Sequence, residues 1–563
     1  MNCFGMFNVV FFRILLSSFC FAIASCLFSG FSFGVNNNLF HLPIIFQLFD
    51  LDQFKEDLFI QSLRHYSSGF WFLMTGAFRL FDIKHLFLFL LIFSRFTFFY
   101  GFFLCCSLFS TLAWRDIAIL GFFALLMPFL YGVSFAGGGG LFIDSFTHSE
   151  LANGLVFIFL YFLAQRQLGF AFAINGLCFF LNCFMALWSF LPFCIVFILY
   201  LFNANYNKTF FKTIFFGCFI FGCCALPVVS NIANNPYIHS DLSFSFKEFL
   251  LFYYPYHSFA QSIPFSEYLK LCNLIIITFF CFSNLGRMGK VFIYIFGLYF
   301  FVYLLGFCLS FFLPTFSVLN CHLLRSSVVF HFAASIAIAN YLFTFASNRS
   351  ISGTWLLSST ILLMLLSTFT SFFVMPFMFL CQKKHLFFLN NPTALCLKKT
   401  LTILSFLFLS FYWSFFAVKN LVRSFRLNAH IDDLIELSNW IKENTPADSV
   451  FILPTVNFNE EEKRHLSSQL SPDRGFTDFS VFQSFSQRRV YVDFKRGAAV
   501  MWCPDYFFEW RPRVELVLAL TTLDDFVDFA LRNQIPYVIY DLKQYPDFPC
   551  LYKTERFGLI KVF

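Results

Sequence analysis

Long apolar runs alternate with short polar segments over the first 420 residues of the chain. A helix needs about 20 predominantly apolar residues to cross a bilayer, and a dozen runs approach or exceed that length. They lie at about 8–30, 85–106, 116–134, 148–165, 168–187, 188–204, 210–232, 268–285, 290–313, 324–345, 351–382 and 400–419. The pattern predicts an α-helical polytopic membrane protein with a transmembrane domain over residues 1–420. The first run is longer than a signal-peptide core, so we expect it to be retained.

Charged residues between the runs predict the topology. Positive residues fall in short connections on one side, which the positive-inside rule assigns to the cytoplasm. They are Arg115, Arg166, Lys208, Lys212, Arg287, Lys290 and Arg349. The longer loops 31–84, 135–147 and 233–267 carry acids and are then extracytoplasmic. Lysines 383, 384, 398 and 399 return to the cytoplasm only if 351–382 is a hairpin of two short spans. That gives about 13 transmembrane helices, with the N-terminus inside and the C-terminus outside.

The pattern changes after residue 420. Residues 421–563 hold 37 of the 69 charged side chains, which indicates a separate soluble domain. Helical periodicity at 431–446 and at 521–534 alternates with strand-like runs, and Thr522 with Asp525 forms a capping box. The predicted strands are 449–454, 488–495, 536–542 and 555–563. Alternating strands and helices predict a small α/β domain that is extracytoplasmic in this topology.

Composition narrows the class of protein. The chain is 59% hydrophobic and 12% charged, against about 25% charged in soluble domains. A net charge of +7 suits positive cytoplasmic loops, and no nucleic-acid motif, phosphate-binding glycine loop or zinc-type cysteine pairing is evident. We therefore expect a lipid bilayer as a partner and no nucleic acid. Cys503 and Cys550 are the cysteines of the C-terminal domain. They predict either a disulfide or two separate thiols.

Acids gather in the first loop. Asp50, Asp52, Glu56 and Asp57 fall within eight residues. If this stretch is helical, Asp50 and Asp57 share one face. Such carboxylates could hold a divalent cation, Mg²⁺ or Mn²⁺, or act as a base. The alternative is a polar interfacial helix that caps the bundle.

The next two loops offer other groups. Gly137 to Gly140 permit close backbone approach, and Asp144, His148 and Glu150 follow. With the first loop these residues could complete a metal or phosphate site, or the segment is a flexible hairpin with a capping acid. Loop 233–267 carries Tyr254 and His257, either as an aromatic platform for a sugar or an isoprenoid tail, or as a membrane anchor.

Two further sets of residues complete the candidates. Arg325 opens a span, where a charge is costly, and it suits a phosphate that accepts two parallel hydrogen bonds. The alternative is snorkelling to the headgroups. The soluble domain carries chemistry-bearing residues that either line a surface facing the membrane or form ordinary salt bridges. They are Asp493, Lys495, Arg496, Glu509, Trp510 and Arg513.

Several stretches carry a resemblance to a known superfamily. They are FDLDQFKEDLF in the first loop, HSELANGLVFIFLYFLAQRQLGFAFAINGL in the middle spans, and LSNWIKENTPADSVFILP, RRVYVDFKRG and EWRPR in the C-terminal part. The chain resembles the GT-C superfamily of membrane glycosyltransferases, and within it a group of bacterial multi-pass proteins with a C-terminal α/β extracytoplasmic domain. The resemblance implies a polyprenyl-phosphate-linked sugar donor and maps the acidic first loop onto Asp50 and Asp57.

Three functions follow as expectations. The first is a plasma (inner) membrane glycosyltransferase with an envelope glycan, lipid or protein as acceptor. Asp50 or Asp57 would be catalytic, and metal or phosphate would be held by Glu56, Asp144, His148, Glu150 and Arg325. Substrate would contact Tyr254, His257, Lys495 and Arg496. We expect Asp50 and Asp57 to share a cavity with loop 135–150 and Arg325. The alternatives are a transporter or flippase of lipid-linked sugars, or a non-catalytic envelope scaffold.

Reporter fusions test the topology. A fusion after Arg349 should report the cytoplasm and a fusion after Phe563 the opposite compartment, because the Lys and Arg residues sort to one side. Paired fluorescent and phosphatase reporters measure each position. The same sign at both positions would contradict the predicted topology.

Overall fold

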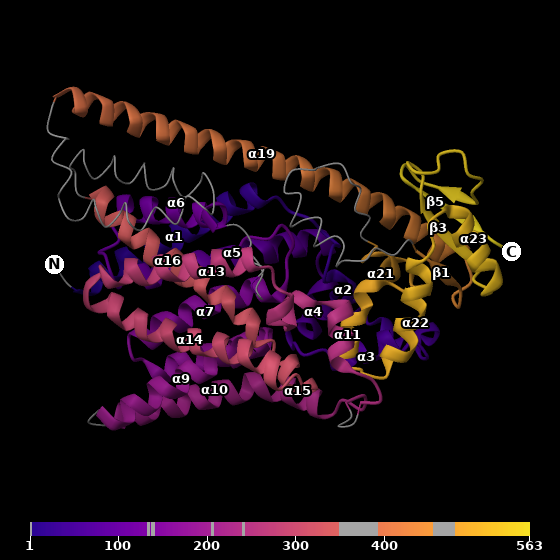
Figure 1. Cartoon of the computed structure of the whole chain (residues 1–563), viewed down its shortest axis with the longest axis horizontal. Helices are drawn as coiled ribbons and strands as arrows, with labels where there is room; N and C mark the ends of the chain where they lie inside the picture. Colours follow the sequence, from indigo (N-terminus) through magenta and orange to yellow (C-terminus); the bar gives the residue numbers. More distant parts are fainter. Residues whose placement is uncertain are drawn as a thin grey trace.

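The computed structural model describes residues 3–131, 136, 141–203, 208–238, 242–347, 392–453 and 479–563. Figure 1 shows a bundle of helices, one very long helix along its side and a small sheet domain at one end. The predicted hairpin at 351–382 and the residues Gly137 to Gly140 lie outside the described residues.

The bundle consists of apolar helices that follow the predicted runs. They are α1 (Cys3–Ser29), α5 (Ile83–Cys106), α6 (Trp114–Tyr131), α7 (His148–Ala164), α8 (Leu168–Leu181), α9 (Cys183–Asn203), α10 (Lys208–Ala233), α13 (Phe265–Ser283), α14 (Gly286–Phe312) and α16 (Val328–Ser347). Seven segments of the described chain are long and apolar enough to cross a membrane, whereas α7 and α8 are shorter apolar helices. The protein is thus a helical, multi-pass membrane protein, and the finer count of 13 spans stays a prediction.

One predicted boundary between spans is wrong. The runs 168–187 and 188–204 were separated at residue 187, but α8 ends and α9 begins around Asn182. The Asn182 side-chain oxygen accepts hydrogen bonds from the backbone N–H groups of Phe184 and Met185, at 3.1 and 3.2 Å. This side chain satisfies the first free donors of α9, which places the break five residues before the predicted one.

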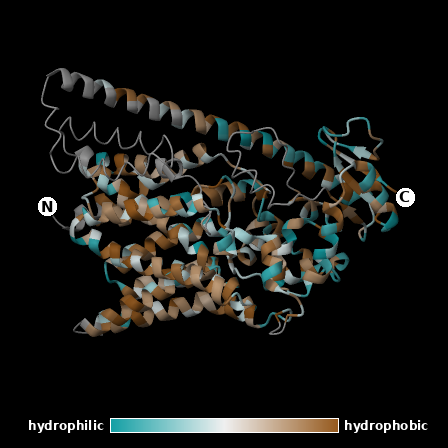
Figure 2. Ribbon diagram, in the orientation of Figure 1, coloured by the Kyte–Doolittle hydropathy of each residue, from teal (hydrophilic) through white to brown (hydrophobic). Residues whose placement is uncertain are grey.

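The two ends of the bundle differ in character. The short connections that carry Arg115, Arg166 and Arg287 lie at the end where α19 begins, and the long loops lie at the end with the C-terminal domain (Figure 1). Figure 2 shows mainly hydrophobic residues along the helices of the bundle and many hydrophilic residues at the domain end. This arrangement agrees with the charge sorting in the sequence.

The first loop is compact and built of short helical pieces. They are α2 (Asn38–Ile45), η1 (Leu48–Asp50), η2 (Asp52–Phe54), α3 (Leu58–Ser62), η3 (Leu63–His65) and α4 (Phe70–Phe78). Leu51 and Asp57 are both extended, so the stretch from Asp50 to Asp57 is not one helix. The premise that Asp50 and Asp57 share a helical face is therefore wrong.

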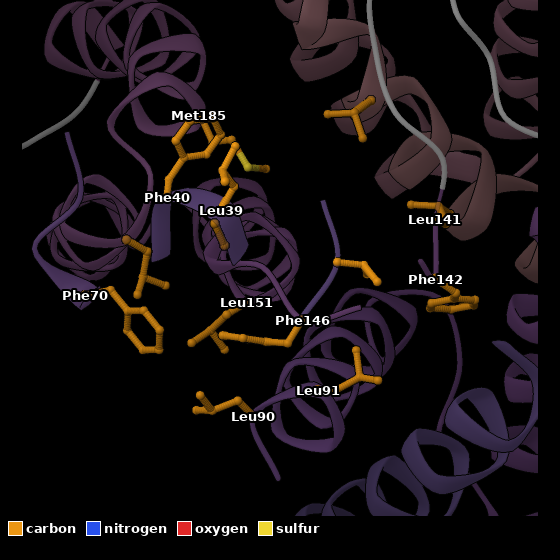
Figure 3. Packing of buried hydrophobic residues seen from close by; sticks show 14 of the residues in the cluster. Leu39, Phe40, Phe70, Leu90, Leu91, Leu141, Phe142, Phe146, Leu151 and Met185 are labelled. Atoms are coloured by element: carbon orange, nitrogen blue, oxygen red, sulfur yellow. The ribbon is translucent and has the colours of Figure 1, made fainter. Parts of the chain in front are cut away.

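The start of the first loop is also buried. Every residue of α2 is buried, and Figure 3 shows Leu39 and Phe40 among buried side chains of neighbouring helices such as Leu91, Leu151 and Met185. Other short helices at this end are α11 (Phe246–Tyr253), α12 (Pro255–Ser258), η4 (Ala260–Ser262), α15 (Phe316–Asn320) and η5 (Leu323–Ser327). Of these short helices, α11 and α15 contact the C-terminal domain.

Helix α19 (Pro392–Asn444) joins the two parts without a linker. The helix predicted at 431–446 is its final part, so the predicted domain boundary at 420 lies inside a continuous helix. Asn428 donates to the Phe31 carbonyl at 2.6 Å and accepts from the Phe33 N–H at 2.9 Å. Lys84, at the start of α5, pairs with Asp432. The helix is thereby fixed to both ends of the first loop.

The C-terminal domain is built on a five-stranded sheet of order β2-β1-β3-β5-β4. Its strands are β1 (Val450–Ile452), β2 (Arg489–Val490), β3 (Tyr537–Asp541), β4 (Tyr552–Lys553) and β5 (Phe557–Lys561). Strands β2, β1 and β3 are parallel, and β5 is antiparallel to both β3 and β4. Its helices are α21 (Phe482–Ser486), η7 (Phe494–Met501), α22 (Tyr506–Leu518) and α23 (Leu523–Arg532).

The predictions for this domain are mostly confirmed. β1, β3 and β5 lie in predicted strands, and Thr522 and Asp525 form the expected capping box of α23. The strand predicted at 488–495 is wrong beyond Val490, because the Asp493 side chain accepts from the Lys495 N–H at 2.8 Å and begins η7. Cys503 and Cys550 are free thiols, so the alternative of two separate thiols holds.

Gly30 should be essential to the joint between α1 and α19. Its φ is +76°, and an added Cβ would lie 2.1 Å from the Ser424 hydroxyl oxygen. Gly30→Ala should lower the free energy of unfolding by at least about 1–2 kcal/mol, since an L-residue is strained at this φ. Thermal unfolding of the purified protein measures it. The matched control is Gly76→Ala in α4, where a Cβ meets nothing within 4 Å and helix propensity favours alanine. Equal effects of both substitutions would contradict the close contact.

Candidate functional site

The rings of His41, Trp71 and His148 contact one another and form what we call the inner wall of the candidate site. His41 of α2 is fully buried and stacks on Trp71 of α4, with ring centroids 3.8 Å apart. The Trp71 indole N–H donates to His148 Nδ1 at 3.0 Å. These rings come from three elements because α2 and α4 fold back into the bundle beside the start of α7.

The C-terminal domain covers this wall. Trp502, which follows η7, donates its indole N–H to the Ser62 hydroxyl at 3.1 Å, and its ring meets Tyr66 edge-on at 5.5 Å. Asn235 and Asn320 donate to the carbonyls of Trp502 and Met501, at 2.8 and 3.0 Å. Residues of three separate loops therefore hold the end of η7 over the site.

Arg325 lies in η5 at the same end of the bundle. It is partly buried, and it lies close enough to several rings for its charge to act on them. They are Tyr66, His148, His257 and His322. No carboxylate of the described chain forms an ion pair with Arg325. An intramembrane or membrane-edge cation is costly unless something compensates its charge, so this residue is a candidate for a functional site.

Polar atoms without partners surround Arg325. The following side-chain atoms are buried and have no hydrogen-bond partner among the described residues: His257 Nδ1, Ser258 Oγ, His322 Nδ1, Ser326 Oγ and Ser327 Oγ. A cavity of about 10 Å³ lies between α12, α14 and η5, lined by His257, Ser258, Ser310 and His322 among others. That volume suits about one water molecule, which could satisfy two or three of these atoms.

The third loop supplies aromatic neighbours and contacts a lysine of the C-terminal domain. Tyr254 and His257 meet edge-on, with centroids 4.1 Å apart. Tyr253 donates its hydroxyl to the Lys495 carbonyl at 2.8 Å, and Lys495 Nζ donates to the Asn36 side chain at 3.3 Å. Lys495 is therefore held beside the first loop.

His41 and His257 are neutral at pH 7. Burial lowers the pKa of the His41 imidazole well below its ordinary value, and His148 and Lys495 lower it further. Burial also lowers the pKa of His257, with Arg325 and His322 adding to the effect. Neutral imidazoles next to Arg325 and Lys495 can donate hydrogen bonds without adding positive charge.

The structure brings together five residues that the sequence singled out. They are His148, Tyr254, His257, Arg325 and Lys495. The acids of the first loop have other partners. Asp50 pairs with Arg64 at 2.7 Å and is about half exposed, and Glu56 is exposed. None of the described contacts of Asp50 or Asp57 reaches Arg325.

Asp57 lies at a joint between the first loop and the C-terminal domain. Its Oδ1 accepts from the Ile60 N–H at 3.0 Å and caps α3, and its Oδ2 accepts from Gln483 at 3.4 Å. Arg496 donates to the other end of Gln483 at 2.5 Å and lies over the Phe59 ring at 4.8 Å. Arg496 is thus part of this joint, which meets Phe40 of α2 through Phe59, with ring centroids 6.0 Å apart.

Other predicted residues serve ion pairs or turns. Glu509 pairs with Arg513 at 2.6 Å, as the salt-bridge alternative had it, and Trp510 is buried. Asp144 accepts from the Ser32 hydroxyl at 3.0 Å. No group of three or more His, Cys, Asp or Glu residues in the described parts is arranged to hold a metal, and the divalent cation stays a prediction.

The sequence did not single out His41, Tyr66, Trp71, His322 or Trp502. The signal that pointed to Arg325, a polar side chain within an apolar stretch, also applies to His41 and His322. Trp71 carried no such signal, because it lies in the apolar run FWFLM. The role of its indole N–H is evident only from its hydrogen bond with His148.

The buried pair Arg95–Glu150 should be required for folding. The two side chains meet at 2.6 Å and are 1% and 6% exposed. Glu150→Gln leaves the Arg95 charge buried without an ionic partner, so the free energy of unfolding should fall by about 3–5 kcal/mol. Denaturant unfolding in detergent measures it. As a control, Asp52→Asn breaks the exposed pair with Lys55 and should change stability by less than about 1 kcal/mol. A small effect at Glu150 would show that the pair is hydrated.

The comparisons with known proteins concern one part of the chain. Residues 432–517 match the model of a domain of unknown function, DUF6798. No curated protein matches the sequence. The matched range begins inside α19 and contains β1, β2, η7 and all but the last residue of α22, which include the elements that contact the first and third loops. The C-terminal part is therefore similar to a domain whose function its description leaves open.

Proposed function

We propose that this protein is a membrane glycosyltransferase that moves a sugar from a polyprenyl-phosphate donor to an acceptor of the cell envelope. The observation that carries the proposal is Arg325, a membrane-edge cation without a carboxylate partner in the described chain, beside neutral histidines and aromatic rings. In this proposal the protein lies in the plasma (inner) membrane, with the C-terminal domain outside the cytoplasm.

A phosphate fits the charge and the donors of this site. A guanidinium can grip two phosphate oxygens with parallel hydrogen bonds, and the charge of the anion offsets that of Arg325. His148, His257 and Tyr66 lie close enough to feel the Arg325 charge, and their ring N–H and hydroxyl groups are further donors. A carboxylate among them would repel the phosphate, and the described contacts of Arg325 include none.

The surrounding rings suit the rest of the donor. Phe40, Tyr66 and Trp502 meet one another with centroid distances of 5.5 to 6.5 Å, and Tyr254 lies near Arg325. Aromatic faces pack against the apolar faces of sugar rings and against isoprenoid chains. Because these rings stand at one end of the bundle, a lipid-linked substrate could reach them from the bilayer.

Asp57 is the carboxylate we propose as the base for the acceptor hydroxyl. It is partly buried at the joint with the C-terminal domain, which would present the acceptor. Each of its oxygens accepts one hydrogen bond from the protein and keeps a second lone pair for a hydroxyl proton. Inverting transfer needs one base and a good leaving group, and polyprenyl phosphate is such a group.

Arg325 variants test the proposal. Arg325→Gln should reduce transfer from polyprenyl-phosphate sugars at least about 100-fold, because one charge-assisted, bidentate contact is worth roughly 3 kcal/mol. Arg325→Lys should keep part of the activity, since it retains the charge and loses the second hydrogen bond. Transfer is measured with purified protein in lipid nanodiscs, together with binding of the donor.

The matched control is Arg532→Gln, on the exposed face of α23, which should leave transfer unchanged. Asp57→Asn should retain donor binding and lose transfer if Asp57 is the base. Full donor binding and transfer in Arg325→Gln would refute the proposal. Movement of lipid-linked sugars across liposomes without transfer would favour a flippase instead.

A further inference from the structure

The hydrogen bond between Trp71 and His148 restricts the chemistry of His148. An indole N–H donates and has no acceptor, so the Nδ1 atom that it meets at 3.0 Å must carry a lone pair. A neutral imidazole with an unprotonated Nδ1 carries its proton on Nε2. A doubly protonated ring would set two N–H groups against each other and lose this bond.

The packing around Trp71 keeps its indole N–H hydrogen-bonded to His148 Nδ1. It is fully buried, with His41 stacked on one side at 3.8 Å and an interplanar angle of 14°. Phe87 stacks at 5.9 Å, and Phe146 meets the indole edge-on at 5.8 Å. Any rotation of the indole would displace these packed rings, so the donor stays directed at His148.

The other ring nitrogen of His148 remains available. Nε2 has no hydrogen bond with the described residues and is not among the atoms sealed from solvent. The ring stands edge-on to Tyr66 at 6.1 Å, and the Arg325 charge acts on it. The Nε2–H group is therefore a free donor in the region of the Arg325 guanidinium.

We infer that Trp71 fixes His148 as the neutral Nε2–H tautomer, so that His148 donates a hydrogen bond to the anionic group held by Arg325 and serves neither as a base nor as a divalent-metal ligand. The ligand chemistry is a phosphate oxygen, which accepts the N–H as a charge-assisted bond. The tautomer stands on the geometry, and the contact with phosphate rests on the proposed function. Trp71 is a positioning residue that acts through His148.

The tautomer can be read by nuclear magnetic resonance of the full chain. With ¹⁵N-labelled histidine, protonated and unprotonated ring nitrogens give separate signals, and His148→Gln assigns the pair. Wild-type protein should show an unprotonated Nδ1 and a protonated Nε2 at His148. Trp71→Phe keeps an aromatic ring and removes the N–H, so His148 should become a mixture of tautomers.

The matched control is Trp188→Phe, because the Trp188 indole donates to the Cys321 carbonyl at 3.1 Å and not to a histidine. It should leave the His148 signals unchanged. A protonated Nδ1 in the wild type, or no response to Trp71→Phe, overturns the inference. The wild-type spectrum decides the tautomer alone if Trp71→Phe does not fold.

Two probes separate this inference from the proposed function. A short-chain polyprenyl phosphate should shift the His148 Nε2 signal, and Arg325→Gln should abolish the shift. Mn²⁺ should not broaden the His148 signals selectively. Selective broadening, or the opposite tautomer, overturns the inference while the transfer assay still supports the enzyme. The expected tautomer without any phosphate response overturns both the donor role and the proposed function.

Discussion

The burial of α2, at the start of the first loop, is the constraint on which the arrangement of this protein depends. α2 carries apolar side chains on all sides, so it must be enclosed, and the bundle alone does not enclose it. The C-terminal domain and the end of α19 complete the enclosure: Ser480 donates to the Asn36 carbonyl, and Asn428 satisfies both Phe31 and Phe33. Buried backbone groups that have no hydrogen-bond partner within the loop need such a partner from outside it, because an unsatisfied buried polar group is costly.

This enclosure explains why the site has an unusual electrostatic character. Asp50 and Asp57 of the first loop have partners at its outer surface and at the joint with the C-terminal domain, whereas His41 and Tyr66 lie against the site. Around Arg325 the chain leaves hydrogen-bond donors and neutral rings. The local field is positive in a region of low dielectric, where charge interactions are much stronger than in water. An anion placed there would satisfy several groups at once.

Much of the bundle could be predicted because a long apolar run directly indicates a membrane span. The start of α23 could be predicted because the residues of a capping box specify local hydrogen bonds. The break at Asn182 and the short β2 could not be predicted from periodicity, since each depends on one side chain that caps the following turn. In the site, Arg325 and His257 were found because polar groups stand out among apolar ones. The grouping of Asp50 with Asp57 failed because it assumed a helix that Leu51 and Asp57 interrupt. Trp71 was missed because its role depends on a partner 77 residues away.

Helix α19 gives the protein a rigid mechanical element. Its 53 residues contain no glycine, and their only proline is the first, so none of the usual causes of a kink lies inside it. At 1.5 Å per residue the helix is about 80 Å long, far more than the thickness of a bilayer. The C-terminal domain at one tip cannot tilt over the site without swinging the other tip through a corresponding arc. A lever of this length couples the position of the domain to whatever contacts the opposite tip of the helix.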